Sequence, residues 1–288
     1  MTTAEGTIKV DKGIVTAEPA AFARAIKMVK DDGLRGVTIT TDWRDEDPDA
    51  PTCDLSLLAE VAPSMEHFAI VDGIPTRRTL HLESIYALRD LKALSLHQYP
   101  ALDLARFPQL EVLFLTERRG LRGIETLTAL RELRITGLGS PDVSGWKELR
   151  ALAKLWIIQA DRKITTLAGL EVLTGLRHVE IHHCPKLAGV RGLPEALLQF
   201  KVMRCPAFTD FAFLAGNPSL DFLYATTLES LAFLPTMEAI TRLGCESVVD
   251  GDLSPVLATK TMRFVACTDK KHHSHKSAAL MKVLEARP

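Results

Sequence analysis

Several familiar signals are missing from this 288-residue chain. No stretch approaches 18 consecutive apolar residues, so the sequence predicts no membrane-spanning helix. The N-terminal segment MTTAEGTIKVDKG has no basic region followed by an apolar run, which predicts no secretory signal and a cytoplasmic location. The 35 basic residues are balanced by 36 acidic ones. We therefore expect neither a nucleic acid nor a membrane as the partner.

Motifs of catalysis are missing as well. The sequence contains no G-x-S-x-G, no H-E-x-x-H and no G-x-x-x-x-G-K-[ST]. No glycine-rich phosphate loop precedes a predicted helix. The sequence therefore predicts a protein that is not an enzyme, with no catalytic residue, no cofactor and no metal.

What the chain does contain is a repeated pattern of leucines. From Phe107 to Leu127 the apolar residues follow L-x2-L-x2-L-x-L-x5-L-x2-I-x2-L, and the next copy begins at Leu127. The first apolar residue of each predicted strand, here called the marker residue, recurs at intervals of 19, 20, 22, 24, 21 and 23 residues. These markers are Leu94, Leu113, Leu133, Leu155, Val179, Phe200 and Leu223. Looser copies have markers at Ile240 and Met262, and earlier ones at Val37, Phe68 and Leu80.

Such a unit consists of a strand, a turn and a return segment, and it buries its apolar residues only against neighbouring units. The expected fold is an α/β solenoid with a parallel β-sheet on its concave face. Return segments such as LRGIETLTAL and LAGLEVLTGL predict 3₁₀ turns or short helices. We expect an N-terminal α/β cap with a first irregular repeat over residues 1–62, the solenoid over 63–268, and a C-terminal capping helix over 269–288.

Both ends of the stack have sequences typical of capping helices. In the N-terminal helix Pro19 fits the first turn and Gly33 the end. Its predicted inner face holds Phe22, Ala25, Ile26 and Val29. At the other end, Ser274 or Ser277 is expected to cap a helix that runs to about Leu284. Its predicted inner side holds Leu280, Val283 and Leu284.

The five cysteines are interpreted from the same register. Cys184, Cys205, Cys245 and Cys267 each follow a predicted marker by five residues, a position that commonly carries Asn or Cys in such repeats. Asn is nearly absent, since Asn217 is the only one. The odd cysteine count and the lack of a C-x2-C pair argue against disulfides and a metal cluster. We therefore expect buried free thiols.

Three charged segments are expected to face water. One is the acidic loop from Asp42 to Asp54, for which a calcium site is the alternative and whose Trp43 folds back on the first repeat. Another is the turn with Arg118, Arg119 and Arg122. The third is the cluster of His272, His273 and His275, for which a weak metal site is the alternative.

Residues that alternate with the markers should face away from the core and line the concave face. The central column is expected to hold Ser95, Phe114, Arg134, Trp156, Glu180, Lys201 and Phe222. A neighbouring column is expected to hold His97, Thr116, Thr136, Ile158, His182, Met203 and Tyr224. Aromatic residues, Met and Arg are typical of interface centres. The predicted partner-binding residues are Phe114, Arg134, Trp156, Ile158, Glu180, His182, Lys201, Met203, Phe222 and Tyr224; the alternative is that a loop covers the rings internally.

One run on this face allows a second interpretation. His178, Glu180 and His182 share a strand face and could hold zinc. However, Lys201 on the next strand is expected to lie beside Glu180, and an ion pair there needs no metal. The metal site is therefore the less favoured alternative.

From Leu88 to Leu234 the chain resembles leucine-rich repeat proteins, and its short 19–24-residue units resemble the bacterial, internalin-like type. The resemblance implies a curved solenoid whose concave face binds a protein or peptide partner. Two departures are the missing secretory signal and the missing asparagine ladder. Two alternatives remain: a regulatory or immunity-type inhibitor subunit of an intracellular enzyme, and a metal-dependent enzyme built on His178, Glu180 and His182.

Overall fold

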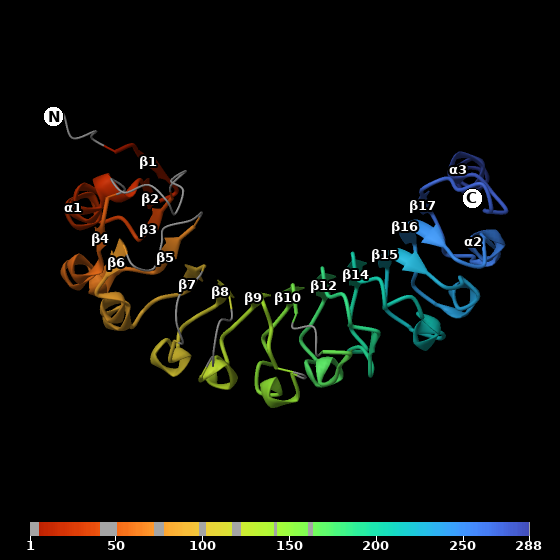
Figure 1. Cartoon of the computed structure of the whole chain (residues 1–288), viewed down its shortest axis with the longest axis horizontal. Helices are drawn as coiled ribbons and strands as arrows, with labels where there is room; N and C mark the ends of the chain where they lie inside the picture. The colour runs from red at the N-terminus through yellow and green to blue at the C-terminus, as the bar shows by residue number, and fades with distance from the viewer. Residues whose placement is uncertain are drawn as a thin grey trace. The chain divides into compact units, whose positions relative to one another are not determined.

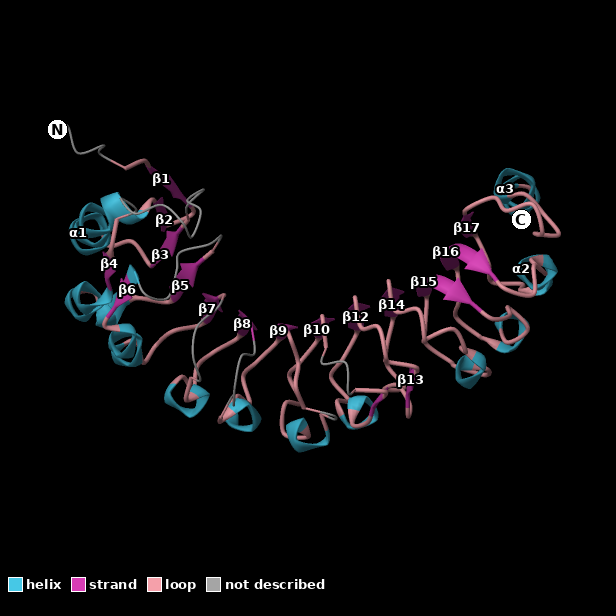
Figure 2. Ribbon diagram, in the orientation of Figure 1, coloured by secondary structure: helices cyan, strands magenta, loops and turns pink. Residues whose placement is uncertain are grey.

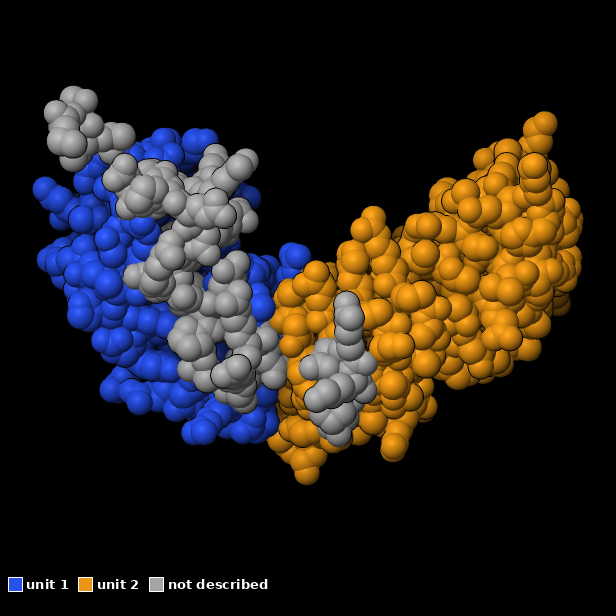
Figure 3. Space-filling view, viewed as in Figure 1, with its two compact units in different colours: residues 1–135 blue, residues 136–288 orange. Residues whose placement is uncertain are grey.

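The computed structural model describes residues 6–40, 51–71, 78–97, 102–116, 122–140, 143–160 and 164–287. The chain divides into two compact units, residues 1–135 and 136–288 (Figure 3). In each unit short strands alternate along the chain with short helical turns (Figure 1). Among the described residues no helix is long and apolar enough to cross a bilayer. Most of the acidic loop with Trp43, and also Arg118 and Arg119, lie outside the described residues.

The first unit begins with a hairpin and continues as a parallel sheet. Its main strands are β1 (Ile8–Asp11), β2 (Ile14–Ala17), β3 (Gly36–Ile39), β5 (His67–Ile70), β7 (Ala93–Leu96), β8 (Val112–Thr116) and β9 (Glu132–Thr136). They lie side by side in that order, β1 antiparallel to β2, and the strands from β2 to β8 parallel. The unit also contains helix α1 (Phe22–Asp32) and the short paired strands β4 (Cys53–Asp54) and β6 (Thr79–Leu80). Its 3₁₀ turns are η1 (Pro19–Ala21), η2 (Leu55–Glu60), η3 (Ala62–Ser64), η5 (Leu82–Ala87), η6 (Leu104–Arg106) and η7 (Ile124–Thr126).

The second unit continues the same pattern with parallel strands. These are β10 (Lys154–Ile158), β12 (His178–His182), β14 (Gln199–Met203), β15 (Phe222–Leu228), β16 (Arg242–Val248) and β17 (Phe264–Cys267), adjacent in that order. The 3₁₀ turn η8 (Ser144–Trp146) precedes β10, and α3 (Ser277–Glu285) follows β17. Between the strands lie η9 (Leu170–Val172), η10 (Ala212–Leu214), η11 (Leu234–Thr236), α2 (Ser254–Ala258) and the short pair β11 (Thr166–Leu167) and β13 (Gly189–Val190). Figure 2 shows the strands along one side of the unit and the helical turns along the other. The prediction of 3₁₀ return segments is confirmed.

Most of the predicted markers occupy one register. Leu155 pairs with Val179, Val179 with Phe200, and Phe200 with Leu223 on adjacent strands. In the first unit Val37 pairs with Phe68, and Leu94 with Leu113. All these side chains are buried, together with the leucines of the return segments. Each unit therefore has a core that runs along its stack, as expected for repeats that bury apolar residues against their neighbours.

Three predicted markers are wrong. Leu223 pairs with Leu243, and Leu243 with Val265, so these two residues take the marker positions assigned by the sequence to Ile240 and Met262. Each error is three residues, because Ile240 and Met262 belong to the buried turn before the strand and fit the same i, i+3 leucine spacing. The third, Leu80, lies in β6 and is half exposed.

Phenylalanines fill the core of the second unit between β14 and η10. Phe200 faces inward from β14, and Phe208 and Phe211 pack against it from the return segment. The rings of Phe208 and Phe211 stack with their centroids 4.9 Å apart. Both are buried, whereas Phe213 is 40% exposed at the edge of this group.

At the end of each middle strand of the second unit the backbone turns through a left-handed residue. Gln159, His183 and Arg204, each four residues after a marker, have φ angles of 54°, 55° and 54°. The turn directs the next side chain inward, where Cys184 Sγ accepts from Ala160 N and Cys205 Sγ accepts from Cys184 N, both at 3.4 Å. Thiols thus satisfy buried backbone donors in two successive repeats. Cys184 and Cys205 are buried free thiols, as predicted.

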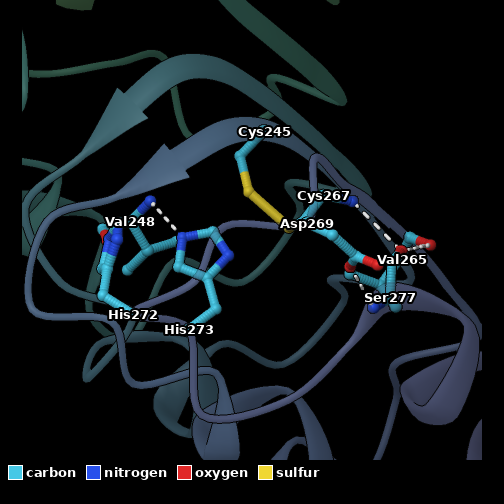
Figure 4. Close-up of a disulfide and its surroundings, with 8 residues drawn as sticks. All are labelled: Cys245, Val248, Val265, Cys267, Asp269, His272, His273 and Ser277. Atoms are coloured by element: carbon cyan, nitrogen blue, oxygen red, sulfur yellow. Dashed lines mark hydrogen bonds between the residues drawn. A yellow bond between two sulfur atoms is a disulfide. The ribbon is translucent and has the colours of Figure 1, made fainter.

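The other two cysteines do not occupy the turn position five residues after a marker. Cys245 and Cys267 lie two residues after Leu243 and Val265, on adjacent strands and facing the core, and they form a disulfide (Figure 4). Their Cα atoms are 4.6 Å apart, because paired positions of β16 and β17 stand opposite each other. The prediction of free thiols is therefore wrong for this pair and holds for Cys53, Cys184 and Cys205.

Helix α1 agrees with the prediction for the N-terminal capping helix. The four expected inner residues of α1 are buried, and Gly33 ends the helix with φ 62°. The hairpin of β1 and β2 was not predicted. Its turn is formed by Lys12 and Gly13, both with positive φ, as a two-residue type I′ hairpin turn requires.

The C-terminal cap differs in detail from prediction. Helix α3 begins at Ser277, whose N–H is accepted by Asp269 Oδ1 at 2.8 Å, so neither predicted serine caps it. Leu280 and Leu284 are buried as expected, but Val283 is half exposed.

The histidine cluster before α3 is not simply a solvated turn. His273 is buried, and its Nε2 accepts from Val248 N at 3.3 Å. His272 Nε2 donates to Val248 O at 3.0 Å (Figure 4). The two rings therefore satisfy the backbone at the end of β16.

Candidate functional site

The strands of the second unit present alternate side chains to opposite sides. In β10, β12 and β14 the marker and the residue two after it are buried, and the residues between and beside them are partly exposed. The partly exposed side is called the strand face. It carries eight of the ten predicted binding residues: Trp156, Ile158, Glu180, His182, Lys201, Met203, Phe222 and Tyr224. Phe114 and Arg134 belong to β8 and β9 in the first unit, where Phe114 is half-buried and Arg134 exposed.

The predicted columns need one correction. Lys201 pairs with Tyr224, not Phe222, and Phe222 pairs with Gln199. Tyr224 therefore belongs to the central column, next to Lys201, and Phe222 to the column on the other side. The prediction placed Phe222 in the central column, two residues from the correct Tyr224. Alternation alone does not separate them, because both flank the buried Leu223 and lie on the strand face.

Glu180 joins two strands at the centre of this face. Its Oε1 accepts from Lys201 Nζ at 2.6 Å, and its Oε2 is 3.1 Å from His182 Nε2. The side chain of Glu180 is 21% exposed and that of Lys201 27% exposed. Burial raises the pKa of Glu180, but the hydrogen bonds and charges of Lys201 and His182 outweigh it and the net pKa is lowered.

The ion pair with Lys201 was predicted and is confirmed. It bears on the alternative of a zinc site at His178, Glu180 and His182, because the Lys201 ammonium already neutralises the only carboxylate of that run. Among the described residues there is no group of three His, Cys, Asp or Glu side chains placed to hold a metal.

Phe222 lies between two cations. Lys201 Nζ is 5.7 Å from the ring centroid, and Arg242 Cζ is 5.0 Å from it. Arg242 is also paired with Asp221, which immediately precedes β15. Burial raises the pKa of Asp221, and hydrogen bonds from Thr241 and Arg242 reverse the shift, so the net pKa is lowered. Glu180, Lys201, Phe222, Arg242 and Asp221 are called the Phe222 cluster.

Tyr224 is held by a glycine. A side-chain carbon built on Gly244, its partner on β16, would lie 2.5 Å from the Tyr224 ring, so the ring rests directly on the backbone of β16. The Tyr224 hydroxyl donates to Glu246 at 3.4 Å. Burial and the charge of Glu246 raise the pKa of Tyr224, so it stays neutral at physiological pH.

Sequence reasoning missed Arg242, Asp221 and Glu246. The wrong marker at Ile240 placed Arg242 out of the strand-face columns. The sequence RLGCESV, where the apolar Leu243 and Cys245 alternate with Arg242, Gly244 and Glu246, is the signal that would have placed it.

Two observations now decide the architecture: buried markers aligned from strand to strand, and 3₁₀ return segments such as η9 and η10 between strands. The fold is that of a leucine-rich repeat. No protein-family model matches the chain, and no curated protein matches it. Among solved structures, an internalin (InlF) of Listeria monocytogenes aligns over 87% of this chain and 72% of its own, with 13% identity and a TM-score of 0.46. A leucine-rich repeat protein of Leptospira interrogans aligns over 94% and 87%, with 11% identity and a TM-score of 0.38.

Glu180→Gln is expected to remove a pH-dependent contribution to stability. Because the folded pKa of Glu180 is lowered, its ion pair stabilises the repeat fold above about pH 4.5 and the contribution is lost as pH falls through the folded pKa. Urea unfolding of wild type and variant from pH 7 to pH 3, in steps of about one pH unit, measures this contribution. The two stabilities should converge at low pH.

The exposed Glu238, whose side chain has no ion pair among the described residues, supplies the matched control. Glu238→Gln should leave the pH dependence of wild type unchanged. A Glu180→Gln difference that stays constant from neutral to acid pH would contradict the assignment.

Proposed function

We propose that this chain is a non-enzymatic interaction module that binds a protein or peptide through the strand face of its second unit. The observation that supports this most is the Phe222 cluster. A large aromatic ring is only half buried and is held between Lys201 and Arg242 instead of packing into the core.

The chemistry of this face suits a protein partner. Aromatic residues and arginine are enriched at the centres of protein interfaces, where they contribute most of the binding free energy. Here the charged side chains are already fixed by Glu180 and Asp221, and Tyr224 is fixed on Gly244. A partner therefore meets side chains that lose little conformational entropy on binding.

The remaining predicted residues extend the proposal. Trp156, Ile158, His182 and Met203 share the strand face with the cluster and would contact the flanks of the partner. Phe114 and Arg134 belong to the first unit and are not part of the surface proposed here.

Site-specific photo-crosslinking tests the proposal. A photoreactive benzoylphenylalanine replaces Phe222 in one variant and Phe213 in another, and each protein is irradiated in an extract of the organism that produces it. Phe213 is the matched control, because it is a partly exposed phenylalanine of the same unit that lies in the return segment η10. We expect a specific covalent adduct with a protein at position 222 only.

Affinity measured with that captured protein then tests the residues. Phe222→Ala should weaken binding by about 30-fold or more, as for a central interface residue. Phe213→Ala should change it less than about twofold. Adducts at position 213 and not at 222, or equal losses in both alanine variants, would overturn the proposal.

A further inference from the structure

The first strand of the first unit has an open edge. β1 stands at the end of the strand order and is paired on one side only, with β2 (Figure 1). An open strand edge presents backbone donors and acceptors that can pair with another strand.

The hairpin geometry identifies which backbone groups point outward. Glu18 N donates to Thr7 O, and the two-residue turn makes Asp11 and Ile14 the closing pair. In an antiparallel pair hydrogen-bonded positions alternate, so Thr7, Lys9 and Asp11 face β2. The N–H and C=O groups of Ile8 and Val10 therefore point to the open edge, and among the described residues neither has a hydrogen-bond partner there.

Three of the four side chains of β1 are exposed to solvent. Val10 is 48% exposed, although its pairing with the buried Val15 places it on the core side. Lys9 and Asp11 are exposed on the opposite side, and neither forms an ion pair with any described residue. The edge thus combines a half-exposed apolar side chain with two exposed charges of opposite sign.

We propose that this edge pairs with the β1 edge of a second copy of the chain, antiparallel and centred on Val10. In that register Val10 faces Val10 of the second copy, and the two exchange both outward backbone hydrogen bonds. Lys9 then faces Asp11 of the second copy, and Asp11 faces its Lys9. The inference is independent of the function proposed for the strand face, which lies in the second unit.

A second copy is favoured over other strands because the sequence is self-complementary in this register. Lys9 and Asp11 are placed symmetrically about Val10, so one two-fold axis forms two opposite-charge pairs at once. The strand is four residues long, which makes the interface small. The dimer is therefore weak and depends on concentration.

Charge exchange at β1 tests the proposal in the full chain. Sedimentation velocity at rising concentration should show wild type in a monomer–dimer equilibrium. K9D and D11K each place like charges opposite each other twice and should weaken the dimer about tenfold or more. An equimolar mixture of K9D and D11K should form a heterodimer, because every facing pair then has opposite charges. The double variant K9D/D11K should recover self-association.

A backbone variant gives a second, independent readout. V10P removes the outward N–H of Val10, which β2 does not use, so the hairpin should keep its fold while the dimer is lost. Circular dichroism and thermal unfolding establish that the fold is kept. A wild type that stays monomeric at every concentration would overturn the proposal. Self-association that is equally strong in K9D, D11K and V10P would do so too, by placing the contact elsewhere.

Discussion

Phe208→Ala is expected to lower the free energy of unfolding by about 3 to 5 kcal/mol. Phe208 is fully enclosed, stacks on Phe211 and meets the edge of Phe200, so its ring joins a strand to the return segment of the same repeat. Removing it leaves a cavity that these two rigid rings cannot close. Urea unfolding followed by circular dichroism measures the loss.

Phe213→Ala is the matched control for that experiment. Phe213 belongs to the same aromatic group, with ring centroids 6.3 Å from Phe208 and 6.2 Å from Phe211, but it is 40% exposed. Its removal should cost about 1 kcal/mol or less, because little apolar area is lost from the core. Equal losses in the two variants would show that Phe208 is not enclosed as described.

Reducing the bond between Cys245 and Cys267 is expected to lower stability by about 3 kcal/mol. The bond links residues 22 apart in the sequence and therefore restricts the unfolded chain at the C-terminal end of the second unit. It also ties β17, which carries the capping helix, to β16. Thermal unfolding with and without a phosphine reductant measures the effect.

Two controls separate the disulfide from other thiol effects. The variant C245S/C267S should unfold at the same temperature with and without reductant. In denatured, unreduced wild type, thiol titration should find the three free cysteines Cys53, Cys184 and Cys205, and after reduction all five. Five reactive thiols without reduction would mean that the bond does not form.

This disulfide also bears on the expected location. Disulfides persist in oxidising compartments and are rare in the cytosol. The cytoplasmic location expected from the N-terminal sequence therefore stays a prediction. The same titration can test it, if thiols are blocked in intact cells before extraction.

The sequence predicts the repeat register correctly where only one apolar residue fits the marker spacing. Leu94, Leu113, Val179 and Phe200 lie in the predicted register. Around each of them, apolar residues recur every two positions in the strand and every three in the return segment, so the strand can be told apart from the return segment. The register failed after Leu223, where Ile240 and Met262 offered the same spacing three residues early. There only pairing with the neighbouring strand decides which apolar residue is the marker.

The sequence predicts which side chains lie on the strand face more accurately than it predicts which of them contact each other. Alternation alone indicates that Glu180, Lys201 and Phe222 leave the core, and one register gives the pairing of Glu180 with Lys201. It does not indicate that Arg242 reaches the Phe222 ring, since that depends on side-chain directions across two strands. The disulfide was missed for a related reason: spacing placed both cysteines in turns, whereas pairing of β16 with β17 places them face to face.

Because Val179 and Phe200 are paired on adjacent strands and lie 21 residues apart, a segment such as 178–198 is one interchangeable module. Its excision in frame would let Leu155 meet Phe200 with the backbone ladder preserved. Lys201 would then adjoin Trp156 and lack a carboxylate neighbour. Gain or loss of whole modules can thus change the composition of the strand face in a single genetic event, without any point change in the surviving residues.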